Sequence, residues 1–139
     1  MEATRTQAGE QAVADLYTEY GRRIHHDRTL DFTATEALEA AGLDVSLAEA
    51  FDDDSWDPVL RDHMDDGLAL AGDDIGTPLI AFDDDEGTRV GLFGPVISHP
   101  PAGEAALRLW DGFVAMATVP GFWEVKRTRT ERPNFGPRP

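Results

Sequence analysis

The chain has 139 residues, and its 27 Asp and Glu against 12 Lys and Arg give a formal net charge of −15. This surplus of acid excludes a nucleic-acid binder that works by neutralising phosphates. The absence of cysteine excludes a disulfide scaffold, a thiol nucleophile, a four-cysteine zinc site and an iron–sulfur centre. No apolar run approaches the roughly 18 residues of a membrane-spanning helix, and the first residues lack the layout of a signal peptide. We therefore expect a cytoplasmic protein that binds neither nucleic acid nor membrane.

The first part of the chain is predicted to be helical after a disordered N-terminus over residues 1–9. From Glu10 to about His26, apolar side chains recur at steps of three and four, as on one stripe of an amphipathic helix. The stripe consists of Val13, Leu16, Tyr17, Tyr20 and Ile24.

Capping motifs predict where the following short helices begin. Thr33 with Glu36 forms a capping box, and Gly42 offers the left-handed stop that ends the helix. Ser46 with Glu49 repeats the same box. Each box predicts a short helix that begins directly after the first residue of the box.

Ser55, followed by Pro58 in the first turn, predicts a longer helix that ends at Gly72. This helix carries an apolar stripe of Trp56, Val59, Leu60, His63, Met64 and Leu68. Residues 10–72 are accordingly expected to form a helical subdomain.

The pattern after Gly72 predicts a β-hairpin and a last helix over residues 73–125. The β-prone runs Pro78–Phe82 and Arg89–Phe93 flank the turn cluster Asp83–Gly87. Helical spacing returns and ends at Pro120. The apolar positions of this helix are Leu109, Trp110, Phe113, Val114 and Ala117.

The tail, residues 126–139, holds five of the twelve basic residues and three prolines, and we expect an extended basic arm against the acidic body. Only two strands are predicted in the whole chain. An isolated hairpin buries too little surface to hold its shape, so either the helices cover it or the sheet continues with strands from elsewhere.

Several short motifs occur in an order that resembles one protein family. Gly76-Thr77-Pro78 precedes a strand, and the hairpin ends in Phe93-Gly94-Pro95-Val96 before a helix that bears Leu109-Trp110. This arrangement resembles the C-terminal half of DsbA-like thioredoxin-fold oxidoreductases. Other matching segments are Leu16–Thr18, Gly21–His25, Glu36–Leu38, Ala41–Leu43, Gly103-Glu104, Arg108–Asp111 and Lys126–Glu131.

The last three of these segments resemble the closing helix and tail of the mycothiol-dependent nitroreductase branch of that family, and the likeness runs from about Gln11 to Phe135. The resemblance implies a partial thioredoxin-like α+β fold, in which a helical insertion packs on a β-hairpin followed by a C-terminal helix. Full-length members begin with a strand and a Cys-x-x-Cys motif that opens a helix. This sequence begins inside the helical insertion, so it reads as a truncated member without that unit.

The resemblance also implies a substrate-binding position at Thr77 and Pro78. In a thioredoxin-type site the nucleophile is a thiolate, and no residue here supplies one. A cis Thr77-Pro78 bond would turn the Thr77 backbone N–H and C=O toward an extended thiol substrate. Because the motifs occur in the order typical of the family, we predict a cis bond here, although most X-Pro bonds are trans.

Other sites have weaker support in the sequence. His25, His26 and Asp27 are adjacent at a helix end and point in different directions, which argues against a shared metal. The acidic run Asp83–Glu86 lacks the ligand spacing of an EF-hand and reads as a solvated turn. We assign no catalytic residue and no metal ligand.

The sequence thus supports two functions of different classes. In the first, the chain belongs to an oxidoreductase family that performs thiol-disulfide or mycothiol-dependent chemistry, but is redox-inactive alone. On this hypothesis the chain binds no cofactor of its own, and the cofactor of the parent family is mycothiol or a similar low-molecular-weight thiol. In the second, it is a degenerate thioredoxin-like binding or dimerisation module. The expected partner is a second copy or the missing N-terminal half.

Overall fold

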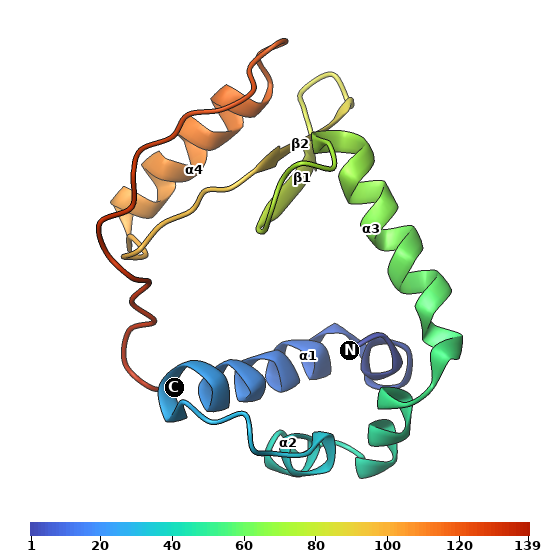
Figure 1. Ribbon diagram of the computed structural model, residues 1–139. Coiled ribbons are helices and arrows are strands. Elements are labelled where there is room, and N and C mark those ends of the chain that lie inside the picture. Colours follow the sequence, from blue (N-terminus) through green and yellow to red (C-terminus); the bar gives the residue numbers. More distant parts are fainter. The chain divides into compact units, whose positions relative to one another are not determined.

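The computed structural model describes residues 1–139 and shows a mixed α/β protein that divides into two compact units. The helical unit comprises Met1–Arg61 and Phe135–Pro139, and the hairpin unit comprises Asp62–Asn134 (Figure 1). The observed division falls at Arg61, inside helix α3, whereas the sequence places it at residue 72.

Helix α1, Glu2–Gly21, opens the helical unit and bends at Gly9, whose φ of 83° interrupts the helical backbone. Residues 2–8, expected to be disordered, are helical in the structure, and Ala3 and Thr4 are buried. The apolar side chains of this segment are small and give no strong hydrophobic periodicity, so the sequence does not predict a helix here. A π-helical turn, Arg22–Asp27, follows α1 directly.

The buried face of α1 differs from the predicted stripe. Ala12, Leu16 and Glu19 are buried, while Tyr17 is 71% exposed. These three residues are spaced by four and three, so they share one face, and Tyr17 lies about 100° round the helix from Leu16. The spacing predicts the helix correctly, but it assigns Tyr17 to the wrong face.

The capping box at Thr33 is confirmed. The Thr33 hydroxyl accepts from Glu36 N at 3.2 Å, and Glu36 Oε2 accepts from Thr33 N at 2.7 Å. The bond from the Thr33 backbone N–H holds the pKa of Glu36 below its ordinary value. Helix α2, Ala34–Ala40, ends with Gly42 in the left-handed region at a φ of 70°.

Aspartates, not the predicted serines, cap the next two turns. Asp44 accepts from Ser46 N ahead of a 3₁₀ turn, Val45–Phe51, and Asp53 accepts from Ser55 N ahead of a second one, Asp54–Trp56. The backbone bond from Ser46 and the side-chain bond from Ser55 are the main causes that lower the pKa of Asp44 and Asp53, respectively. Carboxylate and hydroxyl oxygens both serve as helix caps, so local sequence does not decide between neighbouring candidates.

The core of the helical unit forms where α1, α2 and the first 3₁₀ turn meet. Its buried members are small or aliphatic, and Tyr20, Phe32 and Trp56 pack around them. The buried cluster is Ala3, Leu16, Ala37, Leu38 and Leu47.

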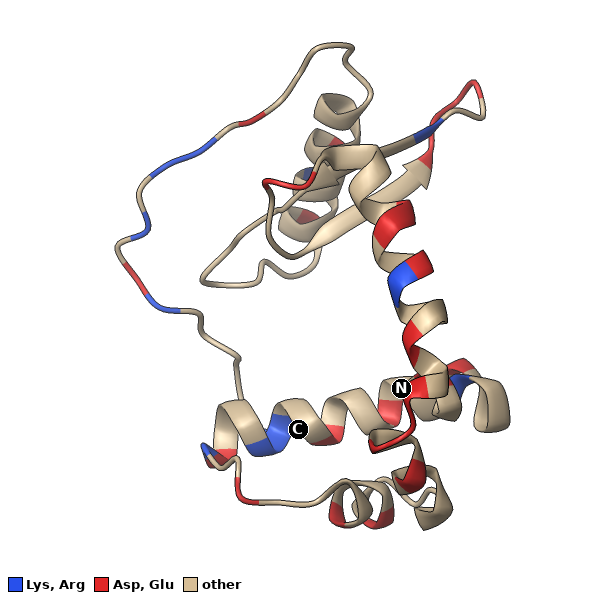
Figure 2. Ribbon diagram, turned by 45° about the vertical axis from the view of Figure 1, so that its right-hand side comes forward, with Lys and Arg blue, Asp and Glu red and all other residues tan.

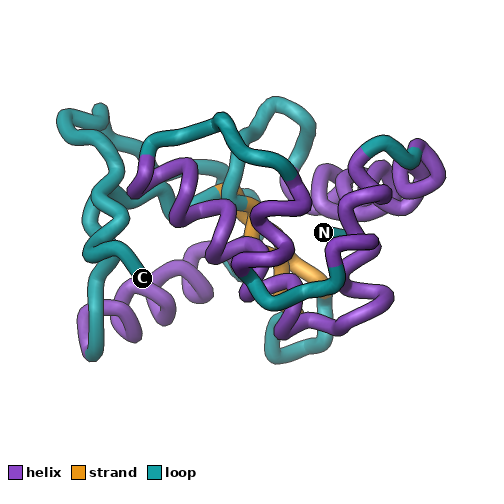
Figure 3. Tube along the Cα trace, turned by 90° about the horizontal axis from the view of Figure 1, so that it is seen from below, coloured by secondary structure: helices purple, strands orange, loops and turns teal.

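Helix α3, Asp57–Ala71, leads into the hairpin unit, where strands β1, Leu79–Asp83, and β2, Arg89–Phe93, form the predicted antiparallel hairpin. In this hairpin, Leu79 pairs with Phe93 and Ala81 pairs with Gly91. The two strands are drawn in orange in Figure 3. Helix α4, Glu104–Ala117, follows, and it ends three residues before Pro120.

The two helices of the hairpin unit cover opposite faces of the strand pair (Figure 1). On one face, Gly67 and Leu70 of α3 lie against Leu79 and Gly91. On the other, Phe82 packs against α4, with its ring centroid 6.0 Å from Trp110 and 6.3 Å from Phe113. Since side chains alternate along a strand, Leu79 and Phe82 must face opposite sides. None of the strand residues is fully buried.

We expect Gly91→Ala to destabilise the hairpin unit by about 1–3 kcal/mol, because a methyl group there overpacks the helix–sheet contact. A Cβ built on Gly91 lies 2.8 Å from Leu70 Cβ. The matched control is Gly112→Ala in α4, where a Cβ meets nothing within 4 Å. This control should be neutral or stabilising by up to about 1 kcal/mol, since alanine favours helix over glycine. Urea unfolding of both variants measures the difference, and equal midpoints would contradict the packing.

No helix of the chain combines the length and apolar character needed to cross a membrane.

Candidate functional site

The candidate site lies where the loop after α3 enters β1. Helix α3 ends at Ala71, Gly72 follows at a φ of 92°, and the loop then leads to Thr77 and Pro78, both exposed. The Thr77-Pro78 peptide bond is cis, as predicted. The binding role of these two residues stays a prediction.

The hydrogen bonds at the two ends of the hairpin define which backbone groups point outward. Gly94 N donates to Pro78 O at 2.8 Å, and Asp84 N donates to Thr88 O at 2.9 Å. In an antiparallel pair, bonded and non-bonded positions alternate, so the even-numbered residues of β1 bond to β2. The N–H and C=O groups of Leu79, Ala81 and Asp83 therefore point to the free edge of β1. We call residues 77–83 along this side the β1 edge.

Thr77 lies at the start of the β1 edge, and its backbone makes no hydrogen bond within the chain. The unpaired groups of Thr77, Leu79 and Ala81 form a row that another extended chain can pair with. The free groups of this edge are thus backbone groups, arranged as in the edge strand of a sheet.

A second cis bond, Gly94-Pro95, lies across the base of the hairpin from the first. Gly94 is buried and has a φ of 106°, a conformation that favours glycine. The Gly94 N–H is the group that fixes Pro78 O. The sequence places Gly94-Pro95 at the end of the hairpin, as a Gly-Pro pair after a strand indicates, but it does not predict this cis bond.

The chemistry at the β1 edge is limited by its residues. The chain contains no cysteine, so no thiolate is present to attack a disulfide. The preceding loop carries Asp73 and Asp74, both exposed, and no basic side chain. The edge can hold an extended substrate, but its residues do not fit covalent attachment to a thiol such as mycothiol.

The histidines of the chain have other contacts. His25 stacks on Phe135, with the ring centroids 4.1 Å apart. The neighbouring Asp27 accepts hydrogen bonds from Nε and one Nη of Arg138, at 2.8 and 3.0 Å. His99 lies 2.6 Å from Glu131. No three His, Asp or Glu side chains of the chain are placed to hold one metal ion.

The strongest electrostatic network lies at the end of α1. Glu19 is only 8% exposed and bonds to Arg22 and to Arg23, the latter at 2.6 Å. The hydrogen bond from Arg22 holds the pKa of Glu19 below its ordinary value, which outweighs the opposing effect of burial, and Arg23 adds to the lowering. Arg22 also reaches Asp27 at 3.1 Å. This network fixes the π-helical turn rather than forming a reactive centre.

Comparison with known proteins identifies the family. The model of the Rv2466c-like family, described as mycothiol-dependent nitroreductase Rv2466c, matches residues 1–127. The chain belongs to this family. The family description implies a mycothiol-dependent oxidoreductase as the parent family, in agreement with the family resemblance of the sequence.

One curated relative is the uncharacterized protein Rv2286c of Mycobacterium tuberculosis (strain ATCC 25618 / H37Rv). It is 31% identical over 122 residues, which cover 82% of this chain and 48% of that protein. The chain thus spans about half the length of this relative.

Proposed function

We propose that this member of the Rv2466c-like family is the docking part of a mycothiol-dependent oxidoreductase and is redox-inactive by itself. The observation that carries the proposal is the unpaired backbone of Thr77 at the start of the free β1 edge, in a chain without cysteine. An extended thiol or disulfide substrate pairs with Thr77 through its own amide groups, as an added strand pairs with a sheet edge. Thr77 and Pro78 are the substrate-binding residues in this proposal.

The finer family assignment supports the same proposal. A DsbA-like thioredoxin fold contains a cis-proline hairpin beside a strand that leads to the reactive cysteine. The cis Thr77-Pro78 bond and the hairpin between two helices are compatible with the C-terminal half of that fold. In that fold the reactive thiolate belongs to the N-terminal half, and mycothiol would meet the thiolate there.

Two measurements on the full chain test the proposal. Thiol-disulfide exchange and nitro-reduction assays with mycothiol should give no turnover above the uncatalysed rate. In an NMR titration with a disulfide-linked conjugate of mycothiol and a short peptide, the amide signals of Thr77, Leu79 and Ala81 should shift. Robust turnover by the pure chain, or shifts confined to other residues, would overturn the proposal.

Ala81→Pro is the informative variant for this titration. It removes an N–H that points to the free edge, and proline is tolerated at such positions, so the β1–β2 ladder survives. Ala81→Ser retains the N–H and is the matched control. We expect at least a tenfold loss of affinity for the proline variant and no loss for the serine variant. Equal binding by both variants would contradict docking at the edge.

A second candidate is a binding module whose β1 edge accepts a strand from another protein. The observation in its favour is that both faces of the strand pair are covered by helices, yet every strand residue retains exposure. An added strand would bury these side chains further. Saturable binding of an unmodified extended peptide, with no preference for the mycothiol conjugate, would favour this candidate over the first.

A further inference from the structure

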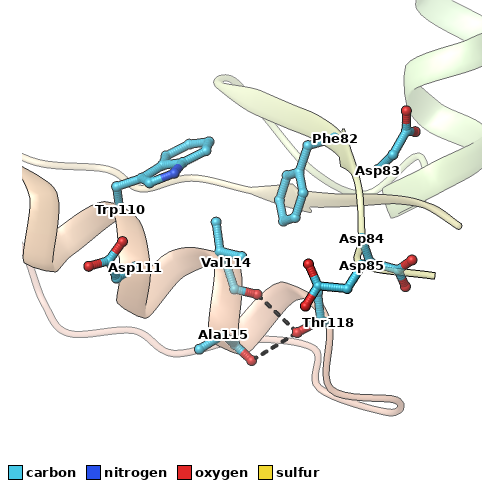
Figure 4. A pocket seen from close by; sticks show the side chains of 9 residues that line it. All are labelled: Phe82, Asp83, Asp84, Asp85, Trp110, Asp111, Val114, Ala115 and Thr118. Atoms are coloured by element: carbon cyan, nitrogen blue, oxygen red, sulfur yellow. Dashed lines mark hydrogen bonds between the residues drawn. The ribbon is translucent and has the colours of Figure 1, made fainter. Parts of the chain in front are cut away.

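A cleft of about 370 Å³ lies between the turn end of the hairpin and α4, within the hairpin unit (Figure 4). Its floor is apolar and aromatic. Phe82 and Trp110 line it together with Val114, and Trp110 remains 46% exposed. An exposed tryptophan stacked at 5.9 Å on the buried Phe113 is a rigid aromatic platform.

The rim of the cleft carries two carboxylates without a cationic partner. Asp83 pairs with Arg89 at 3.2 Å, and Asp84 accepts two backbone N–H groups of the turn. Asp85 and Asp111 line the cleft as well, but neither of them makes an ion pair. They come from different elements, the turn and α4, and they leave uncompensated negative charge beside the Trp110 ring.

The same chain carries a segment of complementary chemistry. The basic arm, Lys126–Arg132, is fully exposed and has neither helix nor strand structure. Arg127, Arg129 and Arg132 make no ion pair, although acids outnumber bases more than twofold in the chain. Figure 2 shows these basic positions in blue along the arm.

The end of the arm is attached to its own chain. Glu131 lies 2.6 Å from His99, Asn134 N donates to Ser98 O at 2.7 Å, and Ser98 Oγ donates to Glu131 O at 3.3 Å. These contacts fix the end of the arm on the loop between β2 and α4. Within one chain, neither these arginines nor the two cleft carboxylates form an ion pair, so both are available to a second copy.

We propose that two copies of this chain exchange their basic arms, and that each arm binds the cleft of the other copy. The arginines of the arm stack on the face of Trp110 and pair with Asp111 at one end of the cleft and with Asp85 at the other (Figure 4), because a planar cation binds both an aromatic face and carboxylates well. A reciprocal exchange closes on itself and gives a two-fold dimer. This inference does not depend on substrate docking at the β1 edge.

The decisive experiment is a charge exchange between two variants of the full chain. One carries Asp85→Arg and Asp111→Arg, and the other carries Arg127→Glu and Arg129→Glu. Each variant alone opposes like charges at both arm–cleft contacts, whereas their mixture pairs opposite charges at both. Light scattering at about 0.15 M salt, where the Debye length is about 8 Å, should show each variant as a monomer and the mixture as a dimer.

The wild-type chain and the control Asp73→Asn/Asp74→Asn should dimerise equally, since that control neutralises two exposed acids outside the cleft. Asp85→Asn/Asp111→Asn should weaken dimerisation at least tenfold. A monomeric wild type, a cleft variant that dimerises as the wild type does, or a mixture that stays monomeric would overturn the proposal. Circular dichroism identifies any variant that fails to fold, and the asparagine pair then tests the cleft without charge reversal.

Discussion

Phe113→Ala should lower the free energy of unfolding of the hairpin unit by about 3–5 kcal/mol, the cost of truncating a buried phenylalanine. Phe113 is 3% exposed and is the only large apolar side chain that the hairpin unit buries fully. Its ring packs on Phe82 and Trp110, at centroid distances of 6.3 and 5.9 Å. Phe113 is therefore the buried member of the aromatic contact between β1 and α4, which Trp110 shares.

Hydrogen exchange measured residue by residue tests this prediction, because it reports the stability of each part of a protein separately. Protection in β1, β2 and α4 should fall, while protection in α2, which belongs to the helical unit, should change little. Leu107→Ala is the control, since Leu107 lies on the same helix but is 64% exposed. A loss as large for Leu107→Ala as for Phe113→Ala would contradict the core described for this unit.

Glu19→Ala should destabilise the helical unit by about 1.5–3 kcal/mol, the range for hydrogen bonds to charged groups. The substitution removes the carboxylate that Arg22 and Arg23 share, so Arg23 loses its ion pair and Arg22 keeps only Asp27; the two arginine side chains are 20% and 19% exposed. Glu19→Gln keeps the shape and one acceptor, so it should cost less. Chemical denaturation followed through Trp56 fluorescence, in a background that replaces Trp110 and Trp123 with Phe, measures both effects.

The loss caused by Glu19→Ala should also depend on pH. Hydrogen bonding to Arg22 lowers the pKa of Glu19 in the folded chain. A depressed carboxyl pKa contributes stability above the unfolded-state value of about 4.3, and this contribution is lost as pH falls through the folded-state value. The wild type and Glu19→Ala should thus differ fully at neutral pH and converge in acid. A difference that is constant from neutral pH to about pH 3 would contradict the ion network.

The family assignment and the absence of cysteine together limit the chemistry that this chain can perform. The family is described as a mycothiol-dependent nitroreductase family, yet this chain contains no cysteine and therefore no thiol. Docking at the β1 edge and exchange of the basic arm meet at Asp83, which ends the edge and also lines the cleft.

Local sequence determined much of this protein. The Thr33 capping box, the stops at Gly42 and Gly72, and the hairpin on either side of the Asp84 turn are all predictable, because each depends on residues within a few positions of one another. The family order of motifs predicted the cis bond at Thr77, and the absence of cysteine limited the chemistry before any fold was known.

Tertiary structure decided which surfaces are buried and which groups remain unpaired. Tyr17 satisfies the helical spacing as well as Leu16 does, but only packing against α2 selects the face that carries Leu16 and Glu19. The outward direction of the Ala81 N–H follows from strand register, and the presence of Asp85 and Trp110 in one cleft follows from how α4 packs on the hairpin. These relations join residues far apart in sequence, so they depend on contacts between elements that no local pattern encodes.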